Sequence, residues 1–414
     1  MKIIFLGGCY SDNYDDIFLK DVKRGELALP ANVYQREIVR GLIENGVDVY
    51  VISCPYLPGY PINFNKGKAP TTPFLLNGEN IGVMAGYNLF FALKDFSAEQ
   101  AYKKYLERWY ADNTELHEKV VLLLYSPLVS QLSAANSFKN RHPNVEICCI
   151  FTDLFYRNLR SVKGGLLKKI QRGIEVIRLQ KLLPSIDKFI LLAKGMEKFV
   201  PEAINNNIIV EGVASPGELF VKQEETKERI LLYTGSLGEH TSIKELIDAF
   251  RLTTNESFRL MICGAGMYSK YISEASQEDK RIIFKGLVPH SEVIDLQRKA
   301  TALINPRWPS IRDTPYSFPS KTMEYLTSGT PMIGYKLVGI PSDYYDFFYT
   351  IEEEGIKPLA HKITEVLCLP QGTLNEKAQK AYNFIKGNKT SKMQAKKIIE
   401  YLKCRTNGVA ENII

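Results

Sequence analysis

The sequence predicts an α/β protein made of two doubly wound domains, each containing a parallel β-sheet. The chain has 414 residues, which is too long for one ordinary hydrophobic core and fits two domains. Short continuous apolar runs alternate with helical patterns, as in parallel sheets that helices cover on both faces. The alternation breaks near residues 200–206 and then restarts with a new strand, glycine turn and helix.

The first half contains five expected strands and two expected helices. The strands are Lys2–Leu6, Val47–Ser53, Val120–Tyr125, Glu146–Phe151 and Ile186–Leu192, and the helices are Asn32–Asn45 and about 195–200. The stretch Leu6-Gly7-Gly8-Cys9 imitates a lipoprotein cleavage box. The apolar run before it is too short for a signal peptide, so a first buried strand that ends in a glycine turn is the better interpretation.

The second half repeats this organisation without a sequence repeat. Its expected strands are Arg229–Tyr233, Arg259–Cys263, Ile282–Lys285, Thr301–Asn305 and Pro331–Tyr335, and its expected helices are Ser242–Leu252 and Lys321–Thr327. A last helix, about 375–404, follows a Pro-Gln-Gly break and is expected to cross back onto the first domain. The predicted domains are therefore 1–203, with 375–404 packed on it, and 204–374.

The composition is that of a globular protein from a reducing compartment. Apolar residues make up 45% of the chain and charged residues 24%, which are ordinary values. The seven cysteines are scattered and form no Cys-x-x-Cys pair, so buried thiols in the cytoplasm are expected instead of disulfides or zinc. No apolar run approaches the roughly 18 residues of a membrane-spanning helix. The net charge of +7 is small for this length, and no nucleic-acid module is present.

The stretch 317–331 is the most specific motif of the chain. Its sequence, Ser-Phe-Pro-Ser-Lys-Thr-Met-Glu-Tyr-Leu-Thr-Ser-Gly-Thr-Pro, predicts a helix that begins near Pro319 and ends at Gly329. Ser320, Lys321 and Glu324 share one face near its N-terminus. Such a terminus suits a diphosphate, and an acidic side chain can bind ribose hydroxyls. The alternative is a surface helix with an ordinary Lys–Glu pair.

Two further glycine turns follow expected strands. Gly235 and Gly238 come after the strand that opens the second half, and Ser242 with Glu245 predicts a capping box at the next helix. Cys263-Gly264-Ala265-Gly266 is a similar turn, although the Gly-x-Gly-x-x-Gly pattern is incomplete. Every doubly wound fold has such turns, so each signal taken alone is weak.

Together these motifs resemble those of a GT-B glycosyltransferase, most of all the retaining family-four enzymes that build bacterial surface polysaccharides. The similarity rests on Tyr-x-Gly-x-Leu at 233–237, Ile-Cys-Gly-Ala-Gly at 262–266, Phe-Lys-Gly-Leu-Val-Pro-His at 284–290, Asn-Pro-Arg at 305–307 and the run 317–331. It is firm over about 185–370 and looser over 1–60. The resemblance implies two facing domains of the Rossmann-like kind, with a cleft between them.

The resemblance also implies a function and a set of site residues. A hexosyl group would pass from a UDP- or other nucleoside diphosphate sugar to a carbohydrate or lipid-linked acceptor, with retention and without a metal or another cofactor. Val288 would contact the base through its backbone and Glu324 the ribose. The residues near the diphosphate and sugar would be Gly7, Gly8, Gly235, Ser236, Gly264, Phe318, Pro319, Ser320 and Lys321. Catalysis would fall to Glu324, Lys321, Arg307 and Asp153.

Several positions depart from the family pattern. Tyr316 stands where the family commonly has a first glutamate, and Ser236 and Thr241 stand where it has the arginine and lysine of the phosphate clamp. Lys321, Arg307 and Lys244 are the candidate replacement cations, in that order. Asp153 could orient the acceptor or cap a helix. These departures leave open a non-catalytic partner subunit of the same fold, and a GT-B nucleotide-sugar epimerase is a further alternative.

A basic amphipathic segment lies between Arg157 and Lys181. It contains eight Lys and Arg residues and one Glu, interleaved with Leu and Ile. Such a segment can rest on an anionic membrane surface, which would place the protein peripherally at the inner face of the plasma membrane. The alternative is a helix packed on its own sheet with a solvated basic face. The five histidines are scattered and no Asp-x-Asp occurs, so the sequence predicts no metal site.

Overall fold

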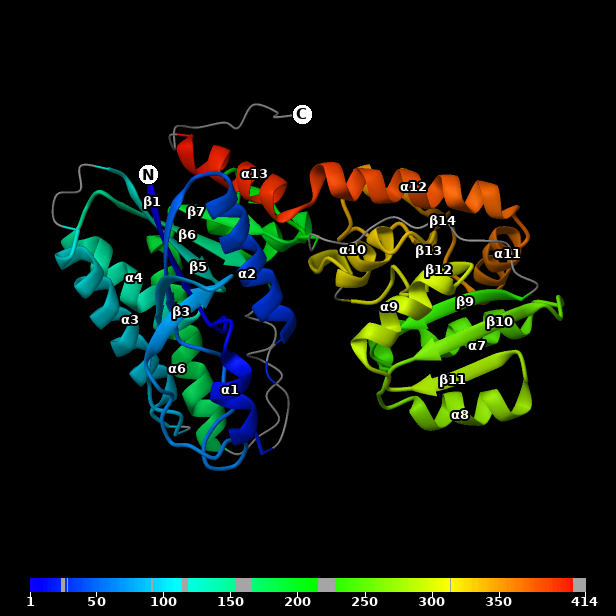
Figure 1. Ribbon diagram of the computed structural model, residues 1–414, viewed down its shortest axis with the longest axis horizontal. Helices are drawn as coiled ribbons and strands as arrows, with labels where there is room; N and C mark the ends of the chain where they lie inside the picture. The colour runs from blue at the N-terminus through cyan, green and yellow to red at the C-terminus, as the bar shows by residue number, and fades with distance from the viewer. Residues whose placement is uncertain are drawn as a thin grey trace. The chain divides into compact units, whose positions relative to one another are not determined.

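The computed structural model describes residues 1–23, 27, 29–90, 92–113, 118–152, 166–214, 228–312 and 314–404. The chain forms two compact units (Figure 1). The first contains residues 1–192, 196–213 and those from 391 onward, and the second contains 193–195 and 214–390. The chain thus passes to the second unit at 213/214, ten residues beyond the predicted boundary at 203/204.

The first unit is built on a sheet with strand order β3-β4-β2-β1-β5-β6-β7-β8. The strands are β1 (Lys2–Gly7), β2 (Asp48–Ser53), β3 (Thr72–Leu76), β4 (Glu79–Met84), β5 (Val120–Tyr125), β6 (Val145–Phe151), β7 (Lys188–Leu191) and β8 (Asn207–Ile209). Only β3 runs antiparallel to its neighbour. Every residue of β5 is buried, as its continuous apolar sequence predicts. The β3–β4 hairpin was not predicted, although its turn, Asn77-Gly78, has positive φ at both residues and is a strong hairpin signal.

Helices cover both faces of this sheet. They are α1 (Tyr14–Phe18), α2 (Leu29–Glu44), α3 (Lys94–Ala111), α4 (Val129–Arg141), α6 (Leu166–Leu182) and α13 (Ser391–Lys403). Helix α2 begins three residues before the predicted start, because Pro30 is accommodated in its first turn. The helix expected at about 195–200 is present as 3₁₀ turns at Lys194–Phe199 and Pro201–Ala203.

The second unit is built on an all-parallel sheet with strand order β11-β10-β9-β12-β13-β14. The strands are β9 (Arg229–Thr234), β10 (Phe258–Cys263), β11 (Ile282–Gly286), β12 (Ala302–Asn305), β13 (Met332–Tyr335) and β14 (Tyr349–Ile351). The helices are α7 (Ile243–Arg251), α8 (Ser269–Glu278), α9 (His290–Lys299), α10 (Ser320–Thr327), α11 (Ile356–Leu367) and α12 (Gln371–Asn388). Strand order therefore reverses between β9 and β12, which is where open α/β sheets bind ligands.

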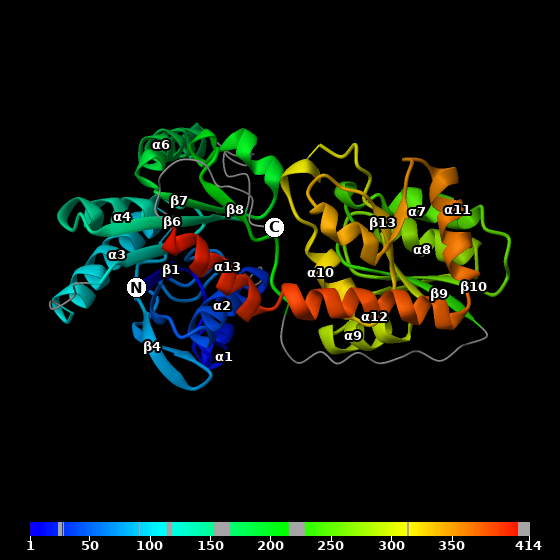
Figure 2. The same ribbon diagram turned by 90° about the horizontal axis from the view of Figure 1, so that it is seen from above.

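The single C-terminal helix predicted over 375–404 is wrong. Two helices occupy this region, and Lys389 and Thr390 separate them. The carbonyl of Lys389 accepts a hydrogen bond from the Ala214 N–H at 2.8 Å, so the chain pairs like a strand at this point and cannot stay helical. Helix α12 belongs to the second unit, and only α13 packs on the first (Figure 2).

Helix α13 is held on the first unit by close backbone packing against α2 and by a lysine of β7 at its C-terminal end. A Cβ added at Gly41 would lie 2.0 Å from the Ser391 carbonyl oxygen, so only glycine permits this approach. At the other end of α13, the Nζ of Lys188 donates to the carbonyls of Tyr401 at 2.8 Å and Cys404 at 2.6 Å. Lys188 is 1% exposed. A cation at this end satisfies the unpaired carbonyls and the negative end of the helix dipole.

The predicted capping box at α7 is also wrong. Ser242 has a left-handed backbone with φ 52°, whereas a capping serine is extended. Its hydroxyl instead accepts the N–H of Trp308 at 3.1 Å. Ser242 therefore ties the turn after β9 to the loop after β12.

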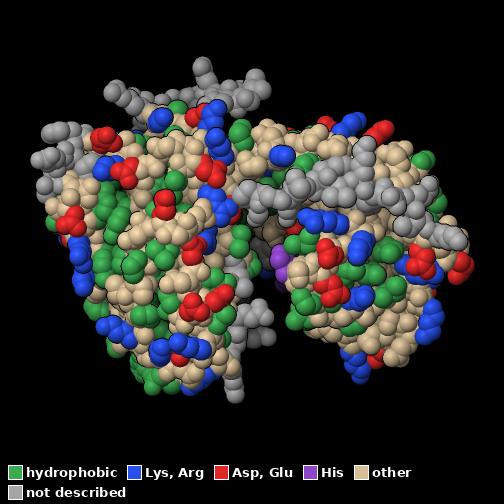
Figure 3. Space-filling model, viewed as in Figure 1, with side chains coloured by type: hydrophobic (Ala, Val, Ile, Leu, Met, Phe, Trp, Pro, Cys, Tyr) green, Lys and Arg blue, Asp and Glu red, His purple; other side chains and the backbone are tan. Residues whose placement is uncertain are grey.

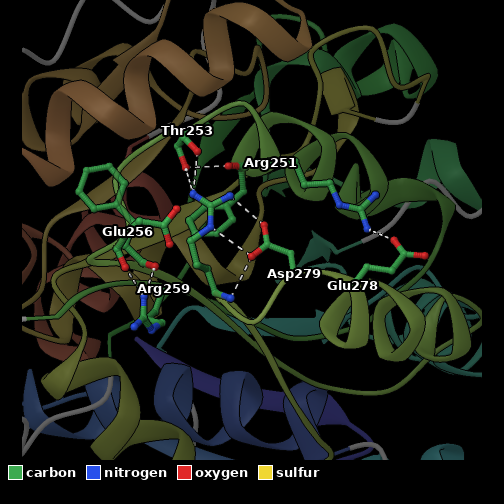
Figure 4. Close-up of polar contacts among 9 residues, drawn as sticks. Arg251, Thr253, Glu256, Arg259, Glu278 and Asp279 are labelled. Carbon is green, nitrogen blue, oxygen red and sulfur yellow. Dashed lines mark hydrogen bonds and ion pairs between the residues drawn. The ribbon is translucent and has the colours of Figure 1, made fainter.

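The amino edge of the second sheet is closed by ion pairs and carbonyl contacts (Figure 4). The guanidinium of Arg281 pairs with Asp279 at 2.8 Å and donates to the Thr253 carbonyl at 2.6 Å. Arg281 lowers the pKa of the Asp279 carboxyl through hydrogen bonds and charge, against the opposing effect of burial. The charged side chains named here are thus paired within the unit, and the candidate site described below lies at the opposite, carboxyl edge.

The buried lysine cap predicts a stability effect. Lys188→Met removes the charge and leaves the carbonyls at the end of α13 without their donor, so we expect a loss of about 2 kcal/mol. Urea denaturation followed by circular dichroism measures it, and limited proteolysis should release α13 sooner. Lys181→Met, at an exposed site of the same unit, is the control and should stay within about 0.5 kcal/mol. Equal stability of both variants would contradict the assignment.

Candidate functional site

Two loops meet the strand-order reversal of the second sheet. The turn 235–242 follows β9, and the longer loop 306–319 follows β12 and leads into α10. Both leave the carboxyl ends of parallel strands, which is the edge where open α/β sheets bind ligands. Most second-unit residues that the sequence singled out lie on these two loops and on α10.

Glycines allow the turns at this edge to pack backbone against backbone. A Cβ added at Gly264 would lie 1.8 Å from the carbonyl oxygen of Gly235. A Cβ added at Gly266 would likewise lie 2.4 Å from the carbonyl oxygen of Leu237. Gly235 and Gly264 have φ of 138° and 142°, which other residues rarely adopt. Gly264 thus acts on the site by supporting the Gly235 turn.

Lys321 reaches into the Gly235 turn from the first turn of α10. Its Nζ donates to the Tyr233 hydroxyl at 2.9 Å and lies 4.3 Å from the centroid of that ring. A Cβ on Gly235 would come within 1.9 Å of the same Nζ. Burial lowers the pKa of Lys321 to about 8; Glu324 opposes this shift and Arg307 adds to it. The ammonium is thus largely buried, and an anion that reached it would attract it more strongly than in water, because the effective dielectric constant is lower there.

Glu324 lies one turn further along the same face of α10 and is partly buried. The side-chain amide of Gln297, from α9, donates to Glu324 Oε1 and to Thr234 Oγ1. Gln297 is itself 2% exposed, and its backbone carbonyl accepts the Thr330 hydroxyl at 2.6 Å. These contacts fix the orientation of the Glu324 carboxylate, as recognition of two neighbouring hydroxyls requires.

Arg307 belongs to the loop after β12, which is held in place at several points. Its Nε donates to the Thr314 hydroxyl at 3.0 Å. The N–H and hydroxyl of Ser310 both bind the Glu354 carboxylate, at 2.9 and 2.6 Å. Lys244 differs from Arg307 and Lys321: its Nζ lies 4.5 Å from the Tyr268 ring, on the side of α8. The structure thus brings Lys321, Glu324 and Arg307 together and directs Lys244 elsewhere.

The remaining second-unit candidates take different positions. Ser236 and Ser320 are exposed at the edge, and Pro319 is the N-cap of α10 with an extended backbone. Phe318 is buried, and its ring packs 5.6 Å from that of Tyr344, so its side chain belongs to the core. Val288 is partly buried against the same core, next to the exposed Leu287.

The predicted glycine turn of the first unit is buried and occupied by protein. The Gly8 N–H donates to Gln35 Oε1 at 2.8 Å, and the Gly7 carbonyl accepts the Tyr102 hydroxyl at 2.7 Å. A Cβ on Gly8 would lie 2.1 Å from the Tyr56 ring. In this conformation both glycines serve internal packing. Asp153 and the basic positions 157–165 lie outside the described residues.

Sequence reasoning missed two side chains of the site, Tyr233 and Gln297. Tyr233 was noted only as part of the Tyr-x-Gly-x-Leu pattern, and Gln297 lies in α9, which was not predicted. A polar residue on the buried face of an amphipathic helix was the available signal for Gln297. No group of three or more His, Cys, Asp or Glu residues suited to a metal ion occurs in the described part of the chain.

Comparisons with known proteins cover the second unit and the overall fold. Residues 217–384 match the family described as Glycosyl transferases group 1, and this span contains the site residues of the second unit. No curated protein matches the chain in sequence.

Solved structures resemble the chain over almost its whole length. The apo form of the lipopolysaccharide outer core galactosyltransferase WaaB is 14% identical with a TM-score of 0.61, covering 97% of this chain and 99% of that one. TarM is 11% identical with a TM-score of 0.60, covering 98% and 99%. An E. coli structure described as trehalose-6-phosphate bound with UDP-2-fluoro glucose is 7% identical with a TM-score of 0.64, covering 97% and 99%.

The chain therefore has the GT-B fold, with two Rossmann-like domains, and residues 217–384 match the family Glycosyl transferases group 1. The resemblance inferred from the sequence is confirmed at this level. The described residues include no helix with both the length and the apolar character needed to cross a bilayer.

The charges around Lys321 predict opposite effects of two substitutions. Glu324 raises the pKa of Lys321 and Arg307 lowers it. Glu324→Gln should therefore move the Lys321 pKa below 8, and Arg307→Gln should move it above. Competitive labelling with acetic anhydride across pH 6–11, read by peptide mass spectrometry, measures both. Shifts in the same direction would show that the two groups do not face Lys321.

Proposed function

We propose that this protein is a glycosyltransferase that moves a hexosyl group from a nucleoside diphosphate sugar to a carbohydrate or lipid-linked acceptor, in the synthesis of a bacterial surface polysaccharide. The observation that carries the proposal is the grouping of Lys321 and Glu324 on the first turns of α10, at the strand-order reversal of the second sheet. The match of residues 217–384 to glycosyltransferases supports it. So does a neighbour of the same fold that holds a UDP-sugar analogue.

The donor roles follow from the chemistry of each group. The N-terminus of α10, with Ser320 and Lys321, offers backbone N–H groups and a cation to a diphosphate. The Gly235 turn lets the phosphates approach the backbone, and Glu324, held by Gln297, accepts the ribose hydroxyls. The Val288 backbone would meet the base. Arg307 would face the sugar or the leaving phosphate.

Transfer would proceed with retention and without a metal or other cofactor. The proposed contribution of the protein is positioning of the donor and stabilisation of charge that develops on the leaving diphosphate. Lys321 would supply the positive charge that stabilises the diphosphate. Loss of activity on treatment with EDTA, restored by magnesium, would refute metal independence, and the anomeric configuration of the product, read by NMR, decides retention.

A nucleic-acid partner is not part of the proposal, since acidic and basic side chains are interspersed on the face in Figure 3.

Nucleotide binding tests the donor site first. We expect one of UDP, GDP and ADP to bind without metal, with micromolar affinity (about −8 kcal/mol), and Glu324→Ala to weaken it by about tenfold. The loss of affinity caused by Glu324→Ala should be smaller for the 2′-deoxy form of the same nucleotide, which lacks one of the hydroxyls that Glu324 would bind. Gln297→Met should also weaken binding, by less than Glu324→Ala. Isothermal titration calorimetry measures all of these.

The pH dependence of the same titration is a second signature. The ammonium form of Lys321 attracts the diphosphate and is lost as pH rises through about 8, so affinity should fall above this pH. Lys321→Met should remove that fall. The dependence of nucleotide affinity on pH in this variant also shows the contribution of the nucleotide's own titration, which can then be subtracted from the wild-type curve. Failure of every nucleotide to bind would instead favour the non-catalytic partner subunit, which the absence of cations at Ser236 and Thr241 already suggests.

We also propose that α6 rests on an anionic membrane surface at the cytoplasmic face. Three isoleucines, Ile170, Ile174 and Ile177, are 52%, 55% and 55% exposed. Their spacing places them on one side of the helix, while Leu179 is buried. Lys169 and Lys181 are exposed on the same helix. Apolar side chains flanked by lysines are what an interfacial helix presents to lipid.

Vesicle flotation tests this contact. The protein should float with vesicles that contain about one third phosphatidylglycerol, and Ile174→Asp should abolish or strongly reduce flotation, because it places a charge in the apolar stripe. Leu252→Asp alters a side chain of the second unit that is 52% exposed and serves as the matched control. Equal flotation of both variants would remove α6 from the contact.

A further inference from the structure

Tyr233 joins the turn after β9 to the lysine of α10. It is 1% exposed, and its hydroxyl donates to the Ser236 carbonyl at 2.7 Å. The same oxygen accepts from Lys321 Nζ at 2.9 Å. The ring lies beneath the ammonium, with 4.3 Å between Nζ and the ring centroid, a favourable cation–π distance.

The partners of Lys321 orient its ammonium without neutralising it. The groups that face it are Tyr233 from β9, Glu324 from its own helix and Arg307 from the loop after β12. Burial raises the pKa of Tyr233, so its phenol stays neutral. A neutral oxygen and a ring hold a cation in place but leave its charge available, whereas a carboxylate in direct contact would compete with an anionic ligand.

Gly235 leaves room for this arrangement. A Cβ at this position would lie 1.9 Å from Lys321 Nζ and 2.2 Å from its Cε. Gly238, in the same turn, has nothing within 4 Å of its Cβ position. A side chain at 235 would therefore displace the end of Lys321 and would also strain a backbone with φ of 138°, whereas a Cβ at 238 would meet no neighbour.

We propose that Tyr233 is a positioning residue that holds Lys321 against the Gly235 turn, so that this lysine serves as the main cation for the donor diphosphate. The inference rests on the proposed function and names the residue that fixes the cation of that site. The competing interpretation is a tyrosine that only fills the core beneath the turn.

Two measurements on one set of variants test the proposal. The set is Tyr233→Phe, Tyr233→Leu, Lys321→Met, the double variant of the last two, Gly235→Ala and the control Gly238→Ala. Acetic anhydride labelling reads the apparent pKa and reactivity of Lys321 without any nucleotide. Calorimetry with UDP, GDP and ADP reads the consequence for binding.

The expected results link the two residues. Tyr233→Leu should free Lys321 into solvent, so its apparent pKa rises by about one unit or more toward the ordinary value. Nucleotide affinity should fall by about tenfold in this variant and by less in Tyr233→Phe, which keeps the ring. In the Lys321→Met background, Tyr233→Leu should cost less than about twofold, because the two residues act as one unit. Gly235→Ala should behave like Tyr233→Leu, and Gly238→Ala like the wild type.

Three outcomes would overturn the proposal. An unchanged Lys321 pKa and reactivity in Tyr233→Leu would show that the tyrosine does not hold the lysine. Equal losses of affinity from Tyr233→Leu with and without Lys321 would show that it acts independently. Absence of nucleotide binding by the wild type would remove the proposed function and this inference together, whereas binding that Tyr233→Leu leaves intact would remove the inference alone.

Discussion

Backbone contacts between the turn after β9 and the turn after β10 hold the candidate site together. The Gly235 N–H donates to the Cys263 carbonyl at 2.9 Å, and the Leu237 N–H donates to the Ala265 carbonyl at 3.1 Å. Because the facing residues Gly235 and Gly264 have no side chains, the two turns touch through their backbones, and a ligand could approach the backbone at this edge. The same close packing leaves a space beside Gly235 that Lys321 fills from α10. The position of the cation therefore depends on glycine in a neighbouring element.

The two units use their glycine turns in opposite ways. In the second unit, glycine admits a charged side chain to the edge of the sheet. In the first unit, the Gly8 N–H, a donor that a phosphate could use, is taken by Gln35 Oε1, and the ring of Tyr56 fills the space beside Gly8. A glycine turn after a parallel strand is thus compatible with a ligand site or with a sealed core. The side chains that arrive from other elements decide between them.

Two lysines of this protein show how partners set the role of a buried cation. Lys188 meets backbone carbonyls at the C-terminus of α13, and these oxygens saturate its donors in the folded state. Lys321 meets a neutral phenol and a ring, which leave part of its donor capacity for a ligand. The first arrangement fastens a helix to its sheet. The second keeps a charge ready for an anion, at the cost of a lowered pKa.

The sequence alone determined the two doubly wound domains and most of the central strands, because a strand buried on both faces must be continuously apolar. It also located Lys321 and Glu324, whose spacing along one helix is a local property. The tertiary structure decided which cation faces the Gly235 turn, that Gln297 orients Glu324, and that the chain splits into α12 and α13 near Lys389. These features depend on contacts between residues far apart in the chain. Local periodicity cannot predict such contacts, because they form only when whole helices and strands pack against one another.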